Sequence, residues 1–325
     1  MTKIIENIKK PIKEDMALFE SYFKNALKSH VPLLDTIMHY IVKRKGKQLR
    51  PMLVFLSARM HGDVNQSTYI AASLIELLHT ATLVHDDVVD ESYYRRGFFS
   101  INALWKNKIA VLVGDYLLSK GLLLSLENKE YDMLQILSGA VKMMSEGELL
   151  QLEKARRLDI TEEIYYQIIE QKTAALIAAC CAAGTLSVTK DQYVVSQMYQ
   201  LGKDIGMAFQ IKDDLFDYDE SAETGKPHAI DIKERKMTLP LIFTLQNCDN
   251  KTKKQIMRIV KNNENDKDKV QFVVNQVIKC GGIAYAENKM NEYKQKALEI
   301  LKSMPRNPAA ESMEMLIEYV TIRKN

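Results

Sequence analysis

Residues 76–90 read Glu-Leu-Leu-His-Thr-Ala-Thr-Leu-Val-His-Asp-Asp-Val-Val-Asp, a mostly apolar run that ends in three aspartates. Apolar residues recur here at three- and four-residue intervals, which predicts a helix with one buried face. Residues four apart on a helix are separated by about 40° and about 6 Å of rise, so Asp86 and Asp90 project from the same face. Three carboxylates this close repel one another and lower helix stability, and a bound cation would offset that repulsion.

The same D-D-x-x-D spacing returns at Asp213, Asp214 and Asp217. Residues 207–216 around it are again largely apolar, so a solvated acidic surface explains neither cluster well. Carboxylate oxygens without a Cys or His set nearby suit Mg²⁺, which binds a few carboxylates together with waters and substrate phosphates. The sequence therefore predicts that magnesium is held by six aspartates: Asp86, Asp87, Asp90, Asp213, Asp214 and Asp217.

Long helices are expected through the rest of the chain as well. No proline lies between Met52 and Lys226, so nothing there removes a backbone donor from a helix. Helical periodicity recurs across this span, whereas strand-like alternation is hard to find, and the chain is predicted to be all-α. Helix breaks are expected at 61–63, 93–100, 127–129, 158–161, 188–191 and 219–236. Without a linker or a general repeat, residues 1–325 are predicted to form a single domain.

Composition excludes several classes of protein. A formal charge of +3 lacks the basic excess of a nucleic-acid binder. Residues 1–16 are charged and lack the apolar core of a secretory signal. The longest nearly uncharged stretch, 174–188, is shorter than the roughly 20 residues of a spanning helix, so no transmembrane segment is expected. Four cysteines without C-x-x-C spacing indicate reduced, buried thiols and a cytoplasmic protein.

Together these motifs resemble the trans-isoprenyl diphosphate synthase family, and most closely its bacterial heptaprenyl and octaprenyl members. The resemblance runs from about Lys43 to Pro240. It implies an isoprenoid-synthase-type helical bundle in which two aspartate-rich motifs face each other across a central cavity. It also implies a prenyltransferase that joins isopentenyl diphosphate to an allylic diphosphate such as farnesyl diphosphate. The expected product is heptaprenyl or octaprenyl diphosphate, for the side chain of a quinone.

Several residues match the family's diphosphate-binding positions. Residues 46–51, Gly-Lys-Gln-Leu-Arg-Pro, resemble the G-K-x-x-R-P segment, although Lys45 stands where the family has a second glycine. The resemblance assigns isopentenyl diphosphate to Lys47, Arg50, His79 and Arg96. It assigns the allylic diphosphate to Arg95, Lys172 and Thr173. Gln210 shares the face of the second cluster, and Lys226 and Lys236 lie on a loop that is predicted to close over the site.

The predicted chemistry is ionisation, condensation and elimination. Cations around a departing diphosphate stabilise charge that develops in the transition state, and binding positions the second substrate. The residues predicted to act in catalysis are Asp86, Asp87, Asp90, Asp213, Asp214, Lys172 and Lys236. No side chain stands out as the base that takes the final proton. Asp115 and Glu148 are expected to make buried structural hydrogen bonds.

Ala81 and Thr82 are small residues that precede the first cluster. In the family, aromatic residues at these positions limit product length, so small ones favour a product longer than farnesyl diphosphate. A helical projection places Thr82 beneath the cluster and Ala81 well off that face, so the role of Ala81 rests on the resemblance alone. The resemblance further implies a homodimer. Whether the protein contacts a membrane transiently during product release is not decided by the sequence.

Three other classes of protein share part of this sequence pattern. A terpene cyclase shares the helical fold and one D-D-x-x-D, but it does not need Lys47, Arg50 and His79. A non-catalytic subunit of a heteromeric synthase predicts degraded clusters, whereas both clusters are intact here. A phosphohydrolase with a His-Asp pair would need metal-binding histidines beyond His85.

Overall fold

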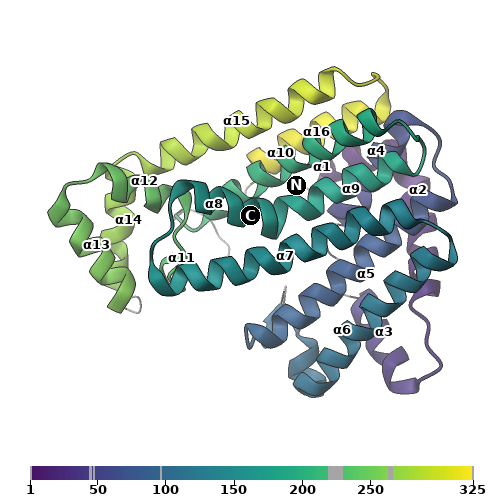
Figure 1. Ribbon diagram of the computed structural model, residues 1–325, viewed down its shortest axis with the longest axis horizontal. Coiled ribbons are helices and arrows are strands. Elements are labelled where there is room, and N and C mark those ends of the chain that lie inside the picture. Colours follow the sequence, from purple (N-terminus) through teal and green to yellow (C-terminus); the bar gives the residue numbers. More distant parts are fainter. Residues whose placement is uncertain are drawn as a thin grey trace.

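The computed structural model describes residues 2–43, 46, 48–95, 97–218, 230–262 and 266–323. The prediction of an all-α chain is confirmed, and the helices stack side by side in an elongated bundle (Figure 1). The elements are α1 (Thr2–Lys9), the 3₁₀ turn η1 (Lys10–Ile12), α2 (Lys13–Ala26), α3 (Pro32–Lys43), α4 (Leu49–His61), α5 (Gln66–Val89), β1 (Tyr94–Arg95), β2 (Phe98–Phe99), α6 (Ile101–Glu127), α7 (Tyr131–Arg157), α8 (Glu162–Ile169), the π turn η2 (Glu170–Ala174), α9 (Ala175–Leu186), α10 (Gln192–Phe216), α11 (Ile230–Lys233), α12 (Leu239–Asn247), α13 (Asn250–Asn262), α14 (Lys267–Lys279), α15 (Gly282–Lys302) and α16 (Pro308–Ile322).

Two of the long helices carry the aspartate clusters. α5 begins with a capping box, in which the Asn65 side chain accepts a hydrogen bond from the Thr68 amide, and it ends at Val89. α10 begins where Asp191 accepts hydrogen bonds from two amides of the first turn, and it ends at Phe216. Each cluster therefore lies at the C-terminal end of its helix, where the helix dipole is already negative. The carboxylates add negative charge at the least favourable place.

α9 is the central helix of the bundle, and every residue in it except Ile177 is buried. Its alanines and glycine let other helices come close: a Cβ built on Gly184 would lie 2.3 Å from the backbone oxygen of Val54 in α4. Two of the four cysteines lie in α9 as buried free thiols, as expected, whereas the other two are half-buried. The apolar stretch 174–188 is therefore a core helix.

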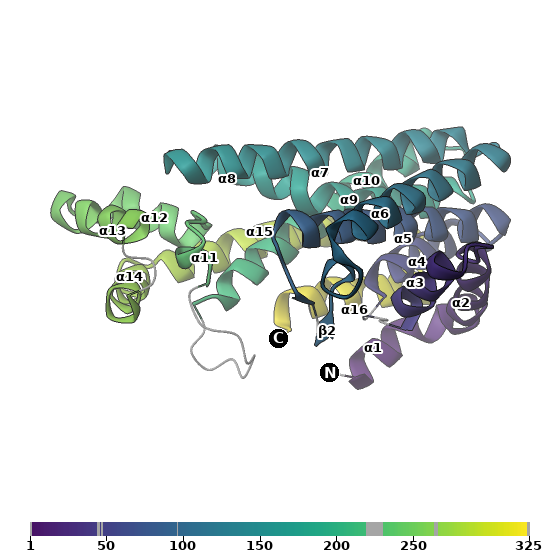
Figure 2. The same cartoon turned by 90° about the horizontal axis from the view of Figure 1, so that it is seen from below.

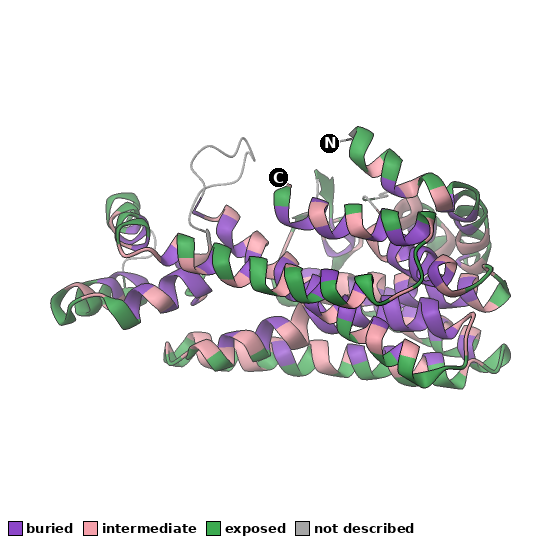
Figure 3. Cartoon of the chain, turned by 90° about the horizontal axis from the view of Figure 1, so that it is seen from above, coloured by how far each residue is buried: buried purple, intermediate pink, exposed green. Residues whose placement is uncertain are grey.

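Buried side chains line the inner faces of the helices, whereas the outer faces of α7 and α15 are exposed along much of their length (Figure 3). Three hydrophobic clusters result. One joins α4, α5, α9, α10 and α16, a second joins α10 to α12 and α14, and a third lies between α3, α5 and α6. Both chain termini lie on the side of the bundle opposite α7 (Figure 2).

The predicted helix breaks fall close to real ones. Thr161 caps α8 by accepting a hydrogen bond from the Ile164 amide at 3.3 Å. The break at 93–100 is a short antiparallel hairpin of β1 and β2, which the helical pattern did not predict. Of the break at 219–236, residues 219–229 lie outside the described residues and α11 follows them. The assignment of one domain stays a prediction.

α5 and α6 are each long and apolar enough to cross a membrane, which the expectation based on residues 174–188 overlooked. The most apolar window of α5 is 61% buried inside the protein, as in a core helix, but that of α6 is only 33% buried. The outer face of α6 exposes these apolar residues: Leu104, Val111, Leu112, Leu122, Leu123 and Leu126. An exposed apolar face of this length is typical of a surface that another chain or lipid covers.

Candidate active site

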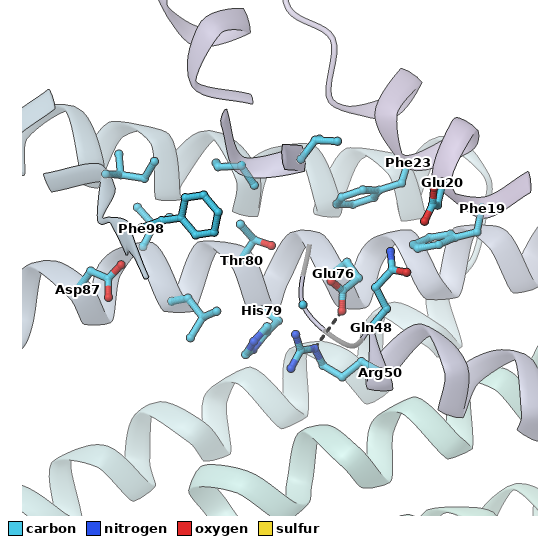
Figure 4. Close-up of a pocket in the computed structure, with 16 residues that line it drawn as sticks. Phe19, Glu20, Phe23, Gln48, Arg50, Glu76, His79, Thr80, Asp87 and Phe98 are labelled. Atoms are coloured by element: carbon cyan, nitrogen blue, oxygen red, sulfur yellow. Dashed lines mark hydrogen bonds and ion pairs between the residues drawn. The ribbon is translucent and has the colours of Figure 1, made fainter. Parts of the chain in front are cut away.

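A first pocket lies beside the start of α4 and is lined by residues of α2, α3, α4 and α5 (Figure 4). Arg50 donates from Nε to Oε1 of Glu76 at 2.9 Å, and both side chains are mostly buried. His79, one turn after Glu76, lines the same pocket. The residues on both sides of Lys47 line it too, although Lys47 lies outside the described residues. The structure thus brings together Arg50 and His79, which were predicted to bind the same substrate.

The first aspartate cluster reaches this pocket through Asp87, at the end away from Arg50 (Figure 4). Asp87 is 3% exposed, and its backbone oxygen accepts a hydrogen bond from the Asn102 side chain at 3.0 Å. Asp86 is half-buried and Asp90 is exposed. The Asp90 amide donates to the Asp86 backbone oxygen at 2.8 Å and closes the last turn of α5. The middle acid is therefore enclosed, whereas the outer two are open to ligands.

The hairpin after the first cluster carries Arg95 and Arg96. The Arg95 backbone belongs to β1, but its side chain and the whole of Arg96 lie outside the described residues. The Tyr40 hydroxyl donates to the Phe99 backbone oxygen at 2.6 Å, and Phe98 lines the first pocket. The hairpin is therefore anchored at the edge of this pocket. The contacts of both arginines with diphosphate stay predictions.

A second pocket contains five predicted site residues, namely Lys172, Thr173, Gln210, Asp214 and Lys236. Side chains that line this pocket are connected by consecutive hydrogen bonds. The Thr173 hydroxyl donates to Gln210 Oε1 at 2.8 Å, and Gln210 Nε2 donates to Asp214 Oδ1 at 2.9 Å. Asp214 Oδ2 accepts from the Tyr165 hydroxyl at 2.7 Å. Both oxygens of the buried Asp214 are thus held in place, and Tyr165 is a residue that the sequence motifs missed.

Lys172 reaches this pocket with two partners from α7. Its Nζ lies 2.5 Å from Glu148 Oε2 and donates to Gln151 Oε1 at 3.3 Å. The expectation of a buried structural hydrogen bond for Glu148 is wrong, because this side chain is 32% exposed and pairs with a predicted catalytic lysine. It is wrong for Asp115 too, which is 60% exposed and lies 3.5 Å from His85 Nε2. Helical periodicity did not show which face of α6 or α7 is covered.

Lys172 and Thr173 lie in the π turn between α8 and α9. A π turn is wider than an α-helical turn and is frequent at functional sites. Two glycines make room for it. A Cβ built on Gly147 in α7 would lie 2.8 Å from Gln171 Cβ, and a Cβ on Gly206 in α10 would lie 2.5 Å from Ala174 Cα. The turn is held between α7 and α10, which sets the positions of the lysine and the threonine.

Gly206→Ala is expected to lower both stability and turnover, because the added methyl group meets backbone that has no free space to move. Overpacking of this kind costs about 1–3 kcal/mol. Gly139→Ala in α7 is the matched control, since a Cβ there meets nothing within 4 Å. Thermal unfolding and steady-state kinetics measure both effects. A Gly206→Ala protein as stable and active as the control would show that the π turn does not depend on this contact.

Asp231 is a further acid beside the second cluster that the D-D-x-x-D pattern missed. Its amide donates to Asp217 Oδ2 at 3.1 Å, and its side chain lines the second pocket. Burial, and then the charge of Asp217, raise the pKa of Asp231 to about 6. Burial, and then the charge of Asp231, raise the pKa of Asp214 to about 7. The sequence feature that could have identified Asp231 is its position five residues before Lys236, in the segment already predicted to close over the site.

Lys236 lies next to these acids. Its Nζ donates to Glu234 and lies 3.8 Å from Asp231 Oδ1. Burial by itself would lower the pKa of Lys236, but the hydrogen bond to Glu234 and the charge of Asp231 outweigh burial and leave the pKa raised. The side chain therefore carries its positive charge into the pocket. Lys226, the other predicted lysine of this loop, lies outside the described residues.

The acids of both clusters fit a hard divalent cation. Their donors are carboxylate oxygens at negative helix ends. Burial, and then the charge of a neighbouring carboxylate, raise the pKa of Asp214 and of the adjacent Asp231, and a nearby cation would lower both pKa values. Within the described residues, no three His, Cys, Asp or Glu side chains lie close enough to hold one metal ion by themselves. Mg²⁺ usually takes only one or two carboxylates and completes its shell with waters and substrate phosphates. The metal roles of the six aspartates stay predictions.

The two residues predicted to set chain length, Ala81 and Thr82, lie in different environments. Ala81 is fully buried in the hydrophobic cluster that α5 shares with α6. Thr82 is half-buried, and its hydroxyl donates to the His79 backbone oxygen of its own helix at 2.8 Å. The helical projection is consistent with this difference, since it turned Ala81 away from the cluster. Their effect on product length stays a prediction.

Comparison with known proteins places this arrangement in a family. The polyprenyl synthetase model matches residues 31–277. The octaprenyl diphosphate synthase of Escherichia coli is 35% identical over 95% of this chain and 96% of its own length. Component 2 of the heptaprenyl diphosphate synthase of Bacillus subtilis is 31% identical over 96% of this chain and 89% of its own. The crystal structure of a decaprenyl diphosphate synthase from Rhodobacter capsulatus superposes with a TM-score of 0.92 at 33% identity, and covers 99% of both chains.

Proposed function

Because this chain belongs to the polyprenyl synthetase family and is a trans-polyprenyl diphosphate synthase, we propose that it makes heptaprenyl or octaprenyl diphosphate from an allylic starter such as farnesyl diphosphate. The observation that carries the proposal is the first pocket, where Arg50 and His79 share one cavity with Asp87, the middle acid of the aspartate cluster of α5. A cation that grips phosphate beside acids that hold metal is the arrangement that two diphosphate substrates need. The small residues Ala81 and Thr82 support a product longer than farnesyl diphosphate.

In this proposal the two pockets hold different substrates. Arg50 and His79, with Lys47 and Arg96, bind isopentenyl diphosphate and orient its double bond. Lys172, Thr173 and Lys236, with Arg95, bind the diphosphate that leaves the allylic substrate, and Gln210 and Lys226 complete this side of the site. Magnesium bound by the aspartate clusters would supply Lewis-acid charge for that leaving group. The proton lost after condensation goes to a base that no described side chain clearly provides.

The test is incubation of the purified protein with farnesyl diphosphate, labelled isopentenyl diphosphate and Mg²⁺, followed by mass measurement of the products. We expect labelled products of about seven or eight isoprene units, the lengths of heptaprenyl and octaprenyl chains. We also expect turnover to stop in EDTA, which removes the metal. Label that stays unincorporated while a hydrocarbon appears would instead indicate a cyclase. Turnover only after a second protein is added would favour a subunit of a heteromeric synthase, which the match to a protein named component 2 keeps as the second candidate.

Glu76→Gln is expected to raise KM for isopentenyl diphosphate several-fold and to leave KM for the allylic substrate nearly unchanged. Glu76 holds the Arg50 guanidinium at 2.9 Å, and without its charge the arginine loses its fixed position in the pocket. Loss of one charge-assisted hydrogen bond corresponds to about a tenfold effect. Glu130→Gln, in the turn before α7, is the matched control. Equal changes in both KM values would contradict a role specific to Arg50.

We also propose that the protein is a cytoplasmic homodimer that covers the apolar outer face of α6. This face exposes Leu112 at 56% and Leu123 at 52%, about three turns apart along one helix. Packing the same face of a second copy against it would remove these side chains from water, in the self-complementary manner of a two-fold interface. Leu112→Lys should then produce monomers in sedimentation experiments. A wild-type protein that sediments as a monomer would contradict the proposal, and a transient membrane contact would become the better account of α6.

A further inference from the structure

The C-terminal segment reaches the second aspartate cluster through Arg323, the residue that follows α16. Its Nη2 donates to Asp213 Oδ1, the first acid of the cluster. Its guanidinium carbon lies 4.0 Å from the centre of the Phe209 ring and 5.4 Å from that of Phe216. Phe209, Asp213 and Phe216 are spaced four and three residues apart, so one face of α10 supplies all three contacts.

This contact encloses a permanent positive charge. The Arg323 side chain is only 12% exposed, and its Nε is buried without a hydrogen-bond acceptor in the described part of the chain. A buried guanidinium with an unsatisfied donor is unfavourable unless an opposite charge compensates for it. Asp213 provides that charge, and stacking on two aromatic rings adds to it. The position of Arg323 therefore depends on the negative charge at the end of α10.

The same carboxylate is one that the proposed function assigns to a metal ion. The guanidinium occupies one direction of Asp213 Oδ1 that a divalent cation would otherwise use, and a cation bound at either oxygen of this carboxylate would lie close enough to Arg323 to be repelled. α16 packs against α10, which brings the residue that follows α16 next to Asp213. Arg323 and a metal ion therefore compete for Asp213.

We propose that Arg323 is the counter-ion of the second aspartate cluster in the metal-free protein. Arg323 holds Asp213 until a divalent cation displaces the guanidinium and frees the C-terminal segment. The inference rests on the proposed metal site at this cluster. It makes Arg323 a positioning residue that keeps α10 and α16 together in the metal-free enzyme. By linkage, the metal weakens the attachment of the C-terminal segment as much as that attachment weakens metal binding.

The first test is binding of Mn²⁺ alone to the full-length protein, followed by electron paramagnetic resonance of the free ion. Arg323→Ala is expected to bind Mn²⁺ about tenfold more tightly than wild type. This factor applies if the guanidinium blocks the site in about nine-tenths of the metal-free molecules, because apparent affinity falls with the fraction of open sites. Arg323→Lys keeps the charge and should stay near wild-type affinity. Arg306→Ala is the control, since it also removes one arginine near α16 but breaks only surface pairs with Glu314 and Glu311.

The second test separates this role from a merely structural one. In EDTA, Arg323→Ala should unfold at a lower temperature than wild type, because an ion pair and two ring contacts are lost. In saturating Mn²⁺ the difference should vanish, because the wild-type contact is then displaced as well. An equal drop in both conditions, with unchanged Mn²⁺ affinity, would overturn the inference and leave Arg323 as an ordinary structural residue.

Asp213→Ala distinguishes failure of this inference from failure of the proposed function. If wild type binds Mn²⁺, Asp213→Ala binds it more weakly and Arg323→Ala binds it as wild type does, only the counter-ion role is wrong. If Asp213→Ala binds Mn²⁺ as well as wild type, the metal assignment of the second cluster fails, and the inference fails with it. If no variant binds Mn²⁺ alone, the same comparison is made with inorganic diphosphate present, which supplies phosphate ligands, and absence of protein-bound Mn²⁺ there has the same consequence.

Discussion

Asp86→Ala and Asp213→Ala are each expected to lower turnover at least about a hundredfold, the scale of losing one main electrostatic stabiliser of a transition state. Both acids lie in the last turn of a long helix, Asp86 in α5 and Asp213 in α10, and both are partly open to ligands. Removing either carboxylate takes away a metal ligand and leaves the departing diphosphate with less positive charge around it. Turnover with saturating substrates and Mg²⁺ measures the effect.

Asp63→Ala is the control for these variants. Asp63 is a fully solvated carboxylate that only pairs with Arg59 across one helical turn, and such pairs contribute at most about 1 kcal/mol. It should keep wild-type turnover. The two cluster variants should differ in stability. Asp86→Ala relieves repulsion at a negative helix end and should not lower the melting temperature. Asp213→Ala also breaks the ion pair with the mostly buried Arg323 and should lower the melting temperature of the metal-free protein. Near-normal turnover in either cluster variant would count heavily against the metal roles.

Thr82→Phe is expected to shift the products from medium or long chains to markedly shorter ones. Thr82 lies one turn before Asp86 on the same face of α5 and is half-buried, so an aromatic ring there would add bulk next to the cluster. A growing hydrocarbon tail that meets the ring stops earlier. Mass measurement of the extracted products gives the chain-length distribution directly.

Two further variants make this result specific. Thr82→Val removes the hydroxyl bond to the His79 backbone without adding volume and should keep wild-type products. Ala81→Phe places the ring in the fully buried contact between α5 and α6, where overpacking costs about 1–3 kcal/mol. If Thr82→Phe makes wild-type products at a normal melting temperature, the tail does not pass this residue.

The sequence predicted the features that depend on local order. The chemistry followed from the family resemblance, whereas helical periodicity, the absence of proline between Met52 and Lys226, and the spacing of each D-D-x-x-D motif predicted the all-α fold and acids that share a helical face. Each of these is a pattern within a few turns of one helix, where residue spacing alone sets which side chains share a face. The same reasoning failed for Asp115 and Glu148, because periodicity shows that a face exists but not what covers it.

Tertiary structure decided the contacts between residues far apart in the chain. Glu76 holds Arg50 from 26 residues away, and Arg323 reaches Asp213 across 110 residues. The burial and the neighbouring carboxylate charge that raise the pKa of Asp214 and Asp231 likewise need α10 and α11 to meet. Such pairs arise only when helices pack, because packing both brings the charges together and removes the water that would otherwise screen them. Local sequence patterns thus identified the residues of the site. The packing of the helix bundle decided which partners these residues have and how their pKa values shift.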